Sequence, residues 1–454
     1  MSDNRGQGSP TEIAEESRTM DRRYFLMGLA GSTAARLSGA SAPRIDGAAL
    51  EADLMALSMF GRPAGGTFQS GVSRIGYSDA DIAGRKFVMD LMRRSGAAVR
   101  VDAAGNIFAE RPGRERGLQP VLFGSHIDSV PNGGNFDGDL GALSAVHVLR
   151  VLRENRMETR RPLTAVVWAC EEATFSGWSL NGSRVAAGKS EARELSLVSR
   201  GFTKTESIRR IGGDPGRLDT ALIGEDAYHA YVELHIEQGG TLAREKVAVG
   251  VVDGIVSFDQ YDVVVTGVAN HAGTTPMQDR QDALVAAARL TLAVREIVTS
   301  EAGAQVGTAG HLEVSPNASN VIPGEVKMSV ELRDLSSAKL DRLGEKIQAR
   351  AAAIAVESRT QIRMTRVERH DSAVAAVEVQ RAIEAAAGRL RLDQRHLPSG
   401  AVHDAQMMAK RMPMGMIFVP SVDGISHSPK EFTAWQDCAN GANVLLETVL
   451  SLAS

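Results

Sequence analysis

Short apolar runs alternate with amphipathic helical patterns from about residue 48 onward. Continuous apolar runs bounded by turn signals predict buried strands, and apolar residues spaced three and four apart predict helices. The runs that predict strands read PVLFGSH, PLTAVVWAC, AYVELHIE, FDQYDVVVTGV, EVKMSVELRD and MGMIFVPS. Strands that alternate with helices, such as the predicted helix GALSAVHVLRVLREN, are typical of an α/β sheet.

The pattern within residues 253–366 indicates a separate unit. An alternating strand, SFDQYDVVVTG, precedes a long helix, DALVAAARLTLAVREIV, and then a second strand, GEVKMSVELRD, precedes the helix AKLDRLGEKIQARAAAIAVES. Strand–helix–strand–helix in so short a stretch predicts a small two-layer α+β domain. We expect it to be inserted between the two parts of a larger domain, residues 48–252 and 367–454.

Composition narrows the class of protein. With 454 residues, 43% of them hydrophobic, the chain can bury a large core, and its length predicts two domains. The formal charge of −4 gives no excess of basic residues, so we expect no nucleic-acid partner. The two cysteines, Cys170 and Cys438, cannot form a disulfide framework and show no CxxC spacing. Any metal site must therefore use His, Asp and Glu.

The N-terminal segment, residues 1–47, differs from the rest. It begins with a polar stretch that we expect to be disordered, and the arginine pair Arg22 and Arg23 then precedes a modestly apolar run that ends in an A-x-A motif. This resembles a twin-arginine export signal and predicts a periplasmic or exported protein. Arg36 within the run and Pro43 directly after the motif weigh against export, and the alternative is an N-terminal helix of a cytoplasmic protein in which the arginine pair occurs by chance. The run is too short and polar for a permanent membrane span, which needs about 20 apolar residues.

An acidic, glycine-rich loop follows a predicted strand in LFGSHIDSVPNGGNFDGDLGALS. The stretch holds His126, Asp128, Asp137 and Asp139 and leads into a predicted helix. Open α/β sheets bind their ligands at the carboxyl ends of strands, in loops of this kind. The alternative is ordinary turn chemistry, because Gly, Asp and the PNGG sequence form turns by themselves.

A second strand, in VVWACEEATFSGW, ends directly in Glu171 and Glu172. Consecutive residues of an extended chain point to opposite sides, so the two carboxylates can serve different tasks. One can bind a metal ion while its neighbour acts as a general base on water. An isolated glutamate pair is more often part of a solvated surface, which is the alternative.

Two further strands end in groups of the same chemistry. AYVELHIEQGG delivers His235, Glu237 and Gln238, and the loop after MIFVPS holds His427. Each motif alone is more often a polar residue with an ordinary hydrogen-bond partner. A parallel sheet aligns the ends of its strands along one edge, however, so four such endings in one chain predict a shared site.

Several motifs together resemble one enzyme family. They are GSHIDSVPNGGNFDGDLG, EE followed by NGSR, ELHIEQGG, NHAGTTPMQDRQDAL, PNASNVIPGEV, SGAVHDAQ and GISHSP. In this order they resemble the hydantoinase/carbamoylase branch of the zinc-dependent M20 amidohydrolases, which contains N-carbamoyl-L-amino acid hydrolases, β-ureidopropionases and allantoate amidohydrolases. The resemblance implies an α/β fold: an open mixed-sheet catalytic domain with an inserted two-layer α+β domain that acts as a lid and forms a homodimer.

The resemblance also implies a centre of two divalent metal ions. Carried over by position, Asp137 bridges the ions, with His126 and His235 on one ion and Glu172 and His427 on the other. Imidazole and carboxylate ligands suit zinc, the metal that the family implies, and also manganese, cobalt or nickel.

Two acidic residues beside these ligands receive separate roles. The resemblance makes Glu171 the general base that acts on a water shared between the ions. Asp128, two residues after His126, is the expected partner of the other ring nitrogen of that histidine.

Substrate-binding groups are also implied by the resemblance. His271 is expected to act across the dimer and polarise the scissile carbonyl, with a purely structural histidine as the alternative. Asn320 and Arg333 are expected to hold the substrate's carboxylate, a task that suits the planar guanidinium fork. Arg333 as a surface charge is the alternative for that residue. Gln238 is expected beside the metal centre and Gly400 beside the substrate.

Two segments depart from the family pattern. Val402 stands where relatives commonly have glycine, and ATFSGW at 173–178 replaces a glycine-containing segment after the glutamate pair. Because both segments are expected near the pocket wall, the motifs do not determine which substrate the protein uses.

The expected reaction is hydrolysis of a C–N bond in an N-carbamoyl-L-amino acid or a similar ureido carboxylate such as allantoate. The alternatives are a related zinc aminopeptidase or aminoacylase, and a non-catalytic binding protein that has kept the fold. The retained ligands and the general base weigh against the last of these.

Overall fold

The computed structural model describes residues 43–454. The arginine pair and the apolar run of the predicted export signal lie outside the described residues, so export stays a prediction. Among the helices of 43–454, none is long and apolar enough to cross a membrane.

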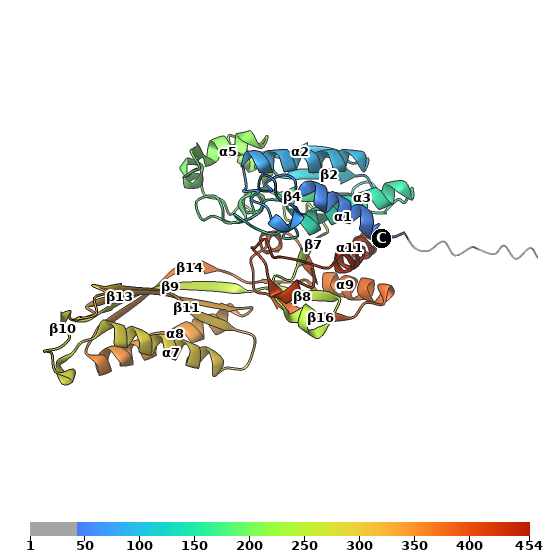
Figure 1. The fold of residues 1–454 in the computed structure, drawn as a ribbon. Helices are drawn as coiled ribbons and strands as arrows, with labels where there is room; N and C mark the ends of the chain where they lie inside the picture. Colours follow the sequence, from blue (N-terminus) through green and yellow to red (C-terminus); the bar gives the residue numbers. More distant parts are fainter. Residues whose placement is uncertain (1–42) are drawn as a thin grey trace, which may run out of the picture. The chain divides into compact units, whose positions relative to one another are not determined.

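A nine-stranded mixed sheet organises the described chain outside residues 257–370 (Figure 1). Its order is β1-β2-β4-β3-β7-β17-β8-β15, and β16 pairs with β8. The neighbours β4, β3, β7 and β17 are parallel, whereas β1, β2 and β15 pair antiparallel. The strands are β1 Ala98–Val101, β2 Ile107–Arg111, β3 Val121–His126, β4 Leu163–Trp168, β7 Ala230–Ile236, β8 Val249–Ile255, β15 Ala373–Val374, β16 Gln394–Ser399 and β17 Met414–Val419.

Helices pack on both faces of this sheet. Consecutive strand residues point to opposite faces, so Phe123 packs in one apolar cluster and Leu122 in another. Helices α1, α2, α3, α9 and α11 contribute to the Phe123 cluster, and α4, α6 and α10 to the Leu122 cluster. Each fully buried side chain of this size contributes about 1.5–3 kcal/mol. The helices are α1 Gly47–Leu57, α2 Asp79–Arg94, α3 Asp139–Glu154, α4 Asn181–Ala186, α5 Lys204–Arg210, α6 Thr241–Glu245, α9 Val377–Leu390, α10 Asp404–Met408 and α11 Trp435–Leu452.

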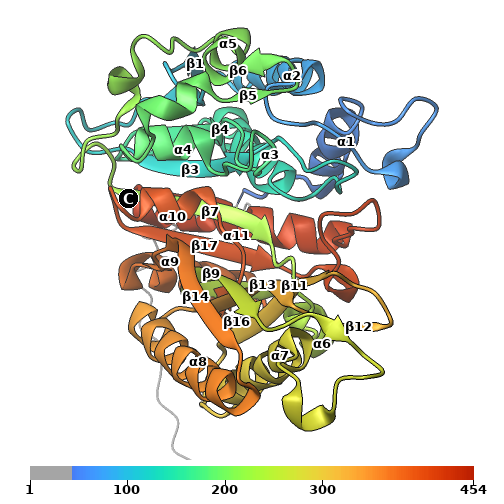
Figure 2. The same cartoon turned by 90° about the vertical axis from the view of Figure 1, so that its left-hand side faces the viewer.

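The central strands are buried along their whole length. Every residue of β3, β4, β7 and β17 is buried, as expected of parallel strands covered on both faces. Their continuous apolar runs are therefore read correctly as strands, and the predicted α/β class is confirmed. Figure 2 shows β7 and β17 side by side, although they are far apart in the sequence.

A four-stranded antiparallel sheet, of order β11-β13-β9-β14, forms a second unit. Helices α7 and α8 cover one of its faces (Figure 1). We call this the inserted unit; its elements run from Ser257 to His370, against the predicted 253–366. They are β9 Ser257–Thr266, α7 Ala283–Thr299, β11 Val306–Ser315, β13 Glu325–Asp334, α8 Ser337–Ser358 and β14 Gln361–His370.

The two edge strands of the inserted unit are absent from the sequence-based prediction. β11 reads VGTAGHLEVS and β14 reads QIRMTRVERH, and neither buries a single residue completely. An edge strand packs against only one neighbour and therefore needs no continuous apolar run. The prediction thus found the central strands β9 and β13 and missed their outer partners.

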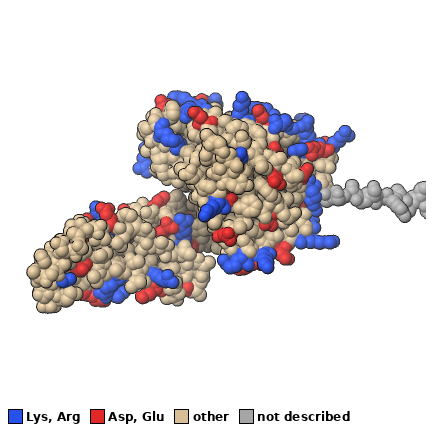
Figure 3. Space-filling view, in the orientation of Figure 1, with Lys and Arg blue, Asp and Glu red and all other residues tan. Residues whose placement is uncertain are grey.

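The smaller elements connect these layers. A short hairpin pairs β5 with β6, and β10 pairs antiparallel with β12, from which it is separated in sequence by α7 and β11. On the face shown in Figure 3, Lys and Arg side chains lie among Asp and Glu side chains, in keeping with the nearly balanced formal charge of −4. The remaining elements are β5 Val198–Ser199, β6 Phe202–Thr203, β10 Asn270–His271, β12 Val321–Ile322 and the 3-10 turns η1 Phe68–Ser70, η2 Ala192–Ser196, η3 Leu218–Ala221, η4 Met277–Asp279 and η5 Val422–Gly424.

Candidate metal centre and active site

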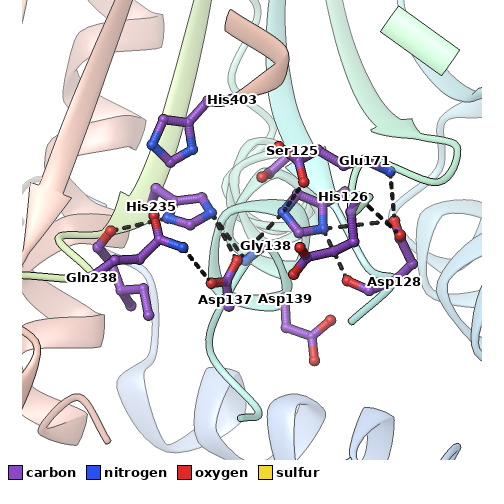
Figure 4. A network of polar contacts seen from close by, with 12 residues as sticks. Ser125, His126, Asp128, Asp137, Gly138, Asp139, Glu171, His235, Gln238 and His403 are labelled. Carbon is purple, nitrogen blue, oxygen red and sulfur yellow. Dashed lines mark hydrogen bonds and ion pairs between the residues drawn. The ribbon is translucent and has the colours of Figure 1, made fainter. Parts of the chain in front are cut away.

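The four predicted strand endings meet at one edge of the large sheet. β3 ends at His126, Glu171 follows the end of β4, His235 is the penultimate residue of β7, and His427 lies in the loop after β17. Because β4, β3, β7 and β17 are parallel neighbours, their carboxyl ends lie side by side. Figure 4 shows three of these side chains, His126, Glu171 and His235, close to one another.

One group of metal-binding side chains consists of His126, Asp137 and His235. Nε2 of His126 lies 3.5 Å, and Nε2 of His235 lies 3.2 Å, from Oδ1 of Asp137 (Figure 4). Each Nδ1 faces a backbone carbonyl: His126 that of Asp128 at 3.0 Å, and His235 that of Ile236 at 2.9 Å. With Nδ1 donating, both rings turn an Nε2 lone pair toward the Asp137 carboxylate, which favours a cation among them.

A second group shares Asp137 with the first. Nε2 of His427 lies 3.5 Å from Oδ2 of Asp137 and 3.7 Å from Oε1 of Glu172. The ligand atoms within each group lie within 4.8 Å of one another. Two ligands about 2.1 Å from one ion at tetrahedral angles are themselves about 3.4 Å apart. The spacing in both groups therefore fits two divalent ions joined by the Asp137 carboxylate.

Burial and like charges perturb the carboxylates of this centre. Burial raises the pKa of Glu171 well above its usual value, and the neighbouring charge of Glu172 raises it further. Burial and then the charge of Asp137 raise the pKa of Glu172 to about 8. Burial opposes ionisation of Asp137 as well, but in the metal-free site His235 first, and then the close imidazoles of His126 and His427, hold its pKa well below normal. So many buried carboxylates in one place are best compensated by bound cations.

A third cluster, of Glu233, His235 and His403, lies beside the first group. Glu233 accepts hydrogen bonds from the Ser125 hydroxyl at 2.7 Å and from the Ala405 amide at 3.0 Å. The His403 ring packs edge-on against His235, with centroids 4.4 Å apart. These contacts orient His235 and use the oxygens of Glu233, so the cluster supports the first group.

Asp128 has a different set of contacts from the one predicted. Its backbone carbonyl, not its carboxylate, receives the hydrogen bond of His126, and the carboxylate Oδ1 lies 3.7 Å from Nδ1 of that ring. The two carboxylate oxygens instead accept the backbone amides of Glu171, at 2.9 Å, and Glu172, at 3.2 Å. Asp128 therefore fixes the backbone that aims the two glutamates in different directions.

A buried ion pair anchors the loop between β3 and α3. The Arg74 side chain, fully buried, pairs with Asp139 and donates to the carbonyl of Ile127. It also donates to the carbonyls of Leu57 at 3.0 Å and Phe60 at 2.9 Å. Asp139 thus serves as the partner of an arginine, which ties the loop carrying Asp137 to the end of α1.

Glu431 is a buried residue of the site that the sequence reasoning missed. Its Oε1 accepts the backbone amides of Phe136, at 3.0 Å, and Asp137, at 3.1 Å. Its Oε2 accepts the Ser426 hydroxyl at 2.8 Å, and that hydroxyl also lies 3.0 Å from Oδ2 of Asp137. A Cβ at Gly134 would lie 2.0 Å from Oε1, so the close approach requires glycine. Glu431 therefore joins the loop of Asp137 to the loop of His427.

Replacing Glu431 by alanine is expected to weaken metal binding by roughly 10- to 100-fold. The change leaves two buried amides without an acceptor and should lower the free energy of unfolding by roughly 3 kcal/mol. Metal titration of the apo-protein and chemical unfolding measure the two effects. Asp102→Ala is the matched control, because Asp102 also accepts two backbone amides, at 2.9 and 2.8 Å, but outside the centre. Equal metal affinity in Glu431→Ala and wild type would contradict the proposed support of Asp137.

Two of the predicted substrate-binding residues contact other predicted site residues: Gln238 contacts Asp137, and Arg333 contacts Gly400. Gln238, in a left-handed conformation with φ 58°, donates from Nε2 to Oδ2 of Asp137 at 2.7 Å (Figure 4). Its Oε1 is buried and has no hydrogen-bond partner among the described residues.

The guanidinium of Arg333 lies 5.0 Å from the Phe258 ring centroid and donates to the carbonyl of Gly400 at 2.5 Å. Arg333 and Gly400 are therefore brought together.

His271 and Asn320 lie elsewhere on the inserted unit. His271 pairs with Val321 in the β10–β12 strand pair, and the Ala272 amide donates to the Asn320 carbonyl at 2.9 Å. This strand pair adjoins the Glu325 end of β13, whereas Arg333 lies near the other end (Figure 1). Eight residues of extended strand cover about 26 Å. One chain thus does not bring His271 to Arg333.

The imidazole of His271 is exposed and has a defined tautomer. The amides of Gly273, at 3.0 Å, and Thr274, at 3.3 Å, both donate to its Nδ1. An Nδ1 that accepts hydrogen bonds leaves the proton on Nε2 in the neutral ring. His271 therefore presents an N–H donor outward from the inserted unit.

These features define a metal-dependent hydrolase of one family: a model of peptidase family M20/M25/M40 matches residues 122–451, and the chain belongs to this family. The N-carbamoyl-L-amino acid amidohydrolase of Geobacillus stearothermophilus is 38% identical over 410 residues, which cover 90% of this chain and 99% of that protein. A ureidoglycolate hydrolase of Arabidopsis thaliana is 36% identical, covering 84% of this chain and 82% of its own. The crystal structure of a hydantoinase/carbamoylase family amidase from Burkholderia multivorans is similar, with a TM-score of 0.84 and 35% sequence identity. The match covers 90% of this chain and 98% of that one. The predicted family and amidohydrolase class are confirmed.

Proposed function

We propose that this chain hydrolyses a ureido C–N bond in an N-carbamoyl-L-amino acid or a related ureido carboxylate, using two divalent metal ions. The observation that carries the proposal is the Asp137 carboxylate shared by two groups of ligands, with Glu171 beside them. The names of the relatives, which specify N-carbamoyl-L-amino acids and ureidoglycolate, support the substrate class. We propose zinc as the native metal because the ligands are imidazole and carboxylate only.

The residues of this chain divide the work of the reaction. Divalent ions held by the two ligand groups would polarise the ureido carbonyl and lower the pKa of a bound water. Glu171, whose Oε2 lies 3.8 Å from Nε2 of His126, takes a proton from the attacking water. As the bond from the ureido carbon to the amino acid nitrogen breaks, Glu171 returns that proton to the leaving nitrogen. Arg333 holds the substrate's carboxylate throughout.

His271 is proposed to complete the site of a second copy of the chain. About 26 Å of strand separates the β10–β12 pair from Arg333 within one chain. β11 supports a dimer through the inserted unit, because this edge strand exposes backbone groups and the apolar side chains of Val306 and Leu312. In this arrangement Nε2–H of His271, together with Asn320, reaches the partner's substrate and stabilises the carbonyl oxygen as it gains charge.

A substrate screen tests the proposed function. The protein is stripped of metal, reconstituted with zinc, manganese, cobalt or nickel, and assayed with N-carbamoyl-L-amino acids, allantoate, N-carbamoyl-β-alanine, dipeptides and N-acetyl amino acids. Turnover of a ureido substrate that disappears with chelation is expected. Faster hydrolysis of dipeptides or N-acetyl amino acids would instead assign an aminopeptidase or aminoacylase.

We also propose export through the twin-arginine pathway, on the basis of Arg22, Arg23 and the apolar run that follows them. A reporter fused to residues 1–50 is expected to leave the cytoplasm of a bacterium that has this pathway. Arg22→Lys with Arg23→Lys should keep the reporter in the cytoplasm. Cytoplasmic retention of the unmutated fusion would overturn the proposal.

A further inference from the structure

A cavity of about 470 Å³ lies beside the proposed active site. Its walls come from three parts of the chain: residues 177–180 with the nearby Lys189, residues 368–371 at the end of β14, and the α10 region with Gln406 and Lys410. Gly177 and Trp178 of the first wall belong to the segment 173–178, in which the sequence departs from the family motif.

Two walls of the cavity adjoin residues of the proposed site. The Leu180 amide donates to the carbonyl of Glu171 at 2.6 Å. The His370 ring packs on Phe258, at 5.8 Å between centroids, and Phe258 also lies under the guanidinium of Arg333. Glu171 thus contacts a wall residue of the cavity directly, and Arg333 does so through Phe258.

Surplus positive charge surrounds the cavity. Lys189 and Lys410 form no ion pair within the described residues 43–454. Arg184 has a carboxylate partner, Glu194, but shares it with the buried Lys204, so two cations face one anion. Of the two acids of the walls, Glu368 lies 2.6 Å from His370, and Asp371 lies 3.8 Å from Arg369. The balance favours an anionic group inside the cavity.

Gln406 adds a polar contact to the same cavity. Its side chain is 1% exposed, and its Nε2 donates to the carbonyl of Asp371 at 2.8 Å. Its Oε1 is buried and has no hydrogen-bond partner in the described part of the chain. A buried acceptor without a partner costs free energy, which a water molecule bound together with an anionic ligand would recover.

We propose that this cavity binds a second acidic group of the substrate, so that the preferred substrates are ureido dicarboxylates such as N-carbamoyl-L-aspartate and N-carbamoyl-L-glutamate. The inference rests on the proposed function. Lys189 and Lys410 select the distal carboxylate, and Arg333 holds the α-carboxylate.

The test compares each acid with its uncharged amide. The ratio of kcat/KM for N-carbamoyl-L-aspartate over N-carbamoyl-L-asparagine, and for the glutamate pair, is measured in wild type and in the Lys189→Met/Lys410→Met double variant. We expect the wild type to favour at least one acid by about tenfold and the double variant to lose about tenfold of that ratio, the scale of two exposed ion pairs. Lys86→Met, which removes an exposed lysine on α2 far from the cavity walls in sequence, is the control and should keep the ratio.

Two results would overturn the proposed preference for ureido dicarboxylates. One is a wild-type enzyme that hydrolyses the amides as fast as the acids, and the other is a double variant with an unchanged ratio. Both differ from failure of the proposed function, in which no ureido substrate is turned over at all. High salt provides a second measurement, since screening should lower the wild-type ratio and leave that of the double variant nearly constant.

Discussion

Glu171→Gln is expected to retain both metal ions and to lose roughly 10²-fold or more of turnover, whereas Glu172→Ala is expected to lose metal. Oε1 of Glu172 lies 3.7 Å from the ligand nitrogen of His427, in a ligand group that also contains Asp137. Asp128 holds the backbone amides of both glutamates, so glutamine at position 171 should keep the local geometry. Metal analysis by mass spectrometry and the rate with a ureido substrate separate the two effects.

Glu154→Gln serves as the control for this pair of variants, because Glu154 is an exposed carboxylate paired with Arg150 on α3. It should match wild type in metal content and rate. Equal metal content and equal loss of activity in Glu171→Gln and Glu172→Ala would show that the two carboxylates do not divide the work.

Mixed dimers of a His271→Ala chain and a Glu171→Gln chain are expected to recover up to about half of the wild-type activity, although each parent is nearly inactive. Loss of a preorganised donor at the developing oxyanion should cost roughly 10²–10³-fold in kcat. If His271 acts in the partner's site, both lesions fall in one site and the other site is intact. Native mass spectrometry of the mixture identifies the heterodimer, and activity is expressed per heterodimer.

A second mixture gives the opposite expectation and controls for assembly. A chain that carries both substitutions is combined with a wild-type chain, so each site of the heterodimer contains one lesion if His271 acts across the dimer. This mixture should be nearly inactive. Half of wild-type activity here, together with no recovery in the first mixture, would place His271 in its own subunit's site.

The sequence predicted the part of the site that depends on strand ends. β3, β4, β7 and β17 are fully buried, so each leaves a continuous apolar run whose last residues are visible in the sequence. The side chains that follow, such as His126 and His235, are reactive types in otherwise apolar surroundings. Parallel neighbours then place them together without any further information.

Residues that act through long-range contacts could not be found in this way. Glu431 binds the amide of Asp137 across 294 positions of sequence, and Arg74 pairs with Asp139 across 65. Both residues stand in segments with no periodic pattern of their own. Their partners are fixed by the packing of loops, which the order of apolar and polar residues does not encode. For Asp128 the sequence correctly predicted a contact with His126 but not the atom involved, which is the backbone carbonyl oxygen and not the carboxylate.

The position of β17 in the large sheet has a consequence for biosynthesis. β17, Met414–Val419, lies between β7 and β8, and its neighbours are made far earlier than the strand itself. A growing chain therefore has a gap in the middle of its sheet. The edges of β7 and β8 that face each other stay unpaired until β17 has left the ribosome. Pairing across such sequence distances is slow and exposes strand edges to aggregation. Nascent chains of this protein should depend on chaperones late in synthesis, and the metal centre can form only after β17 has been inserted.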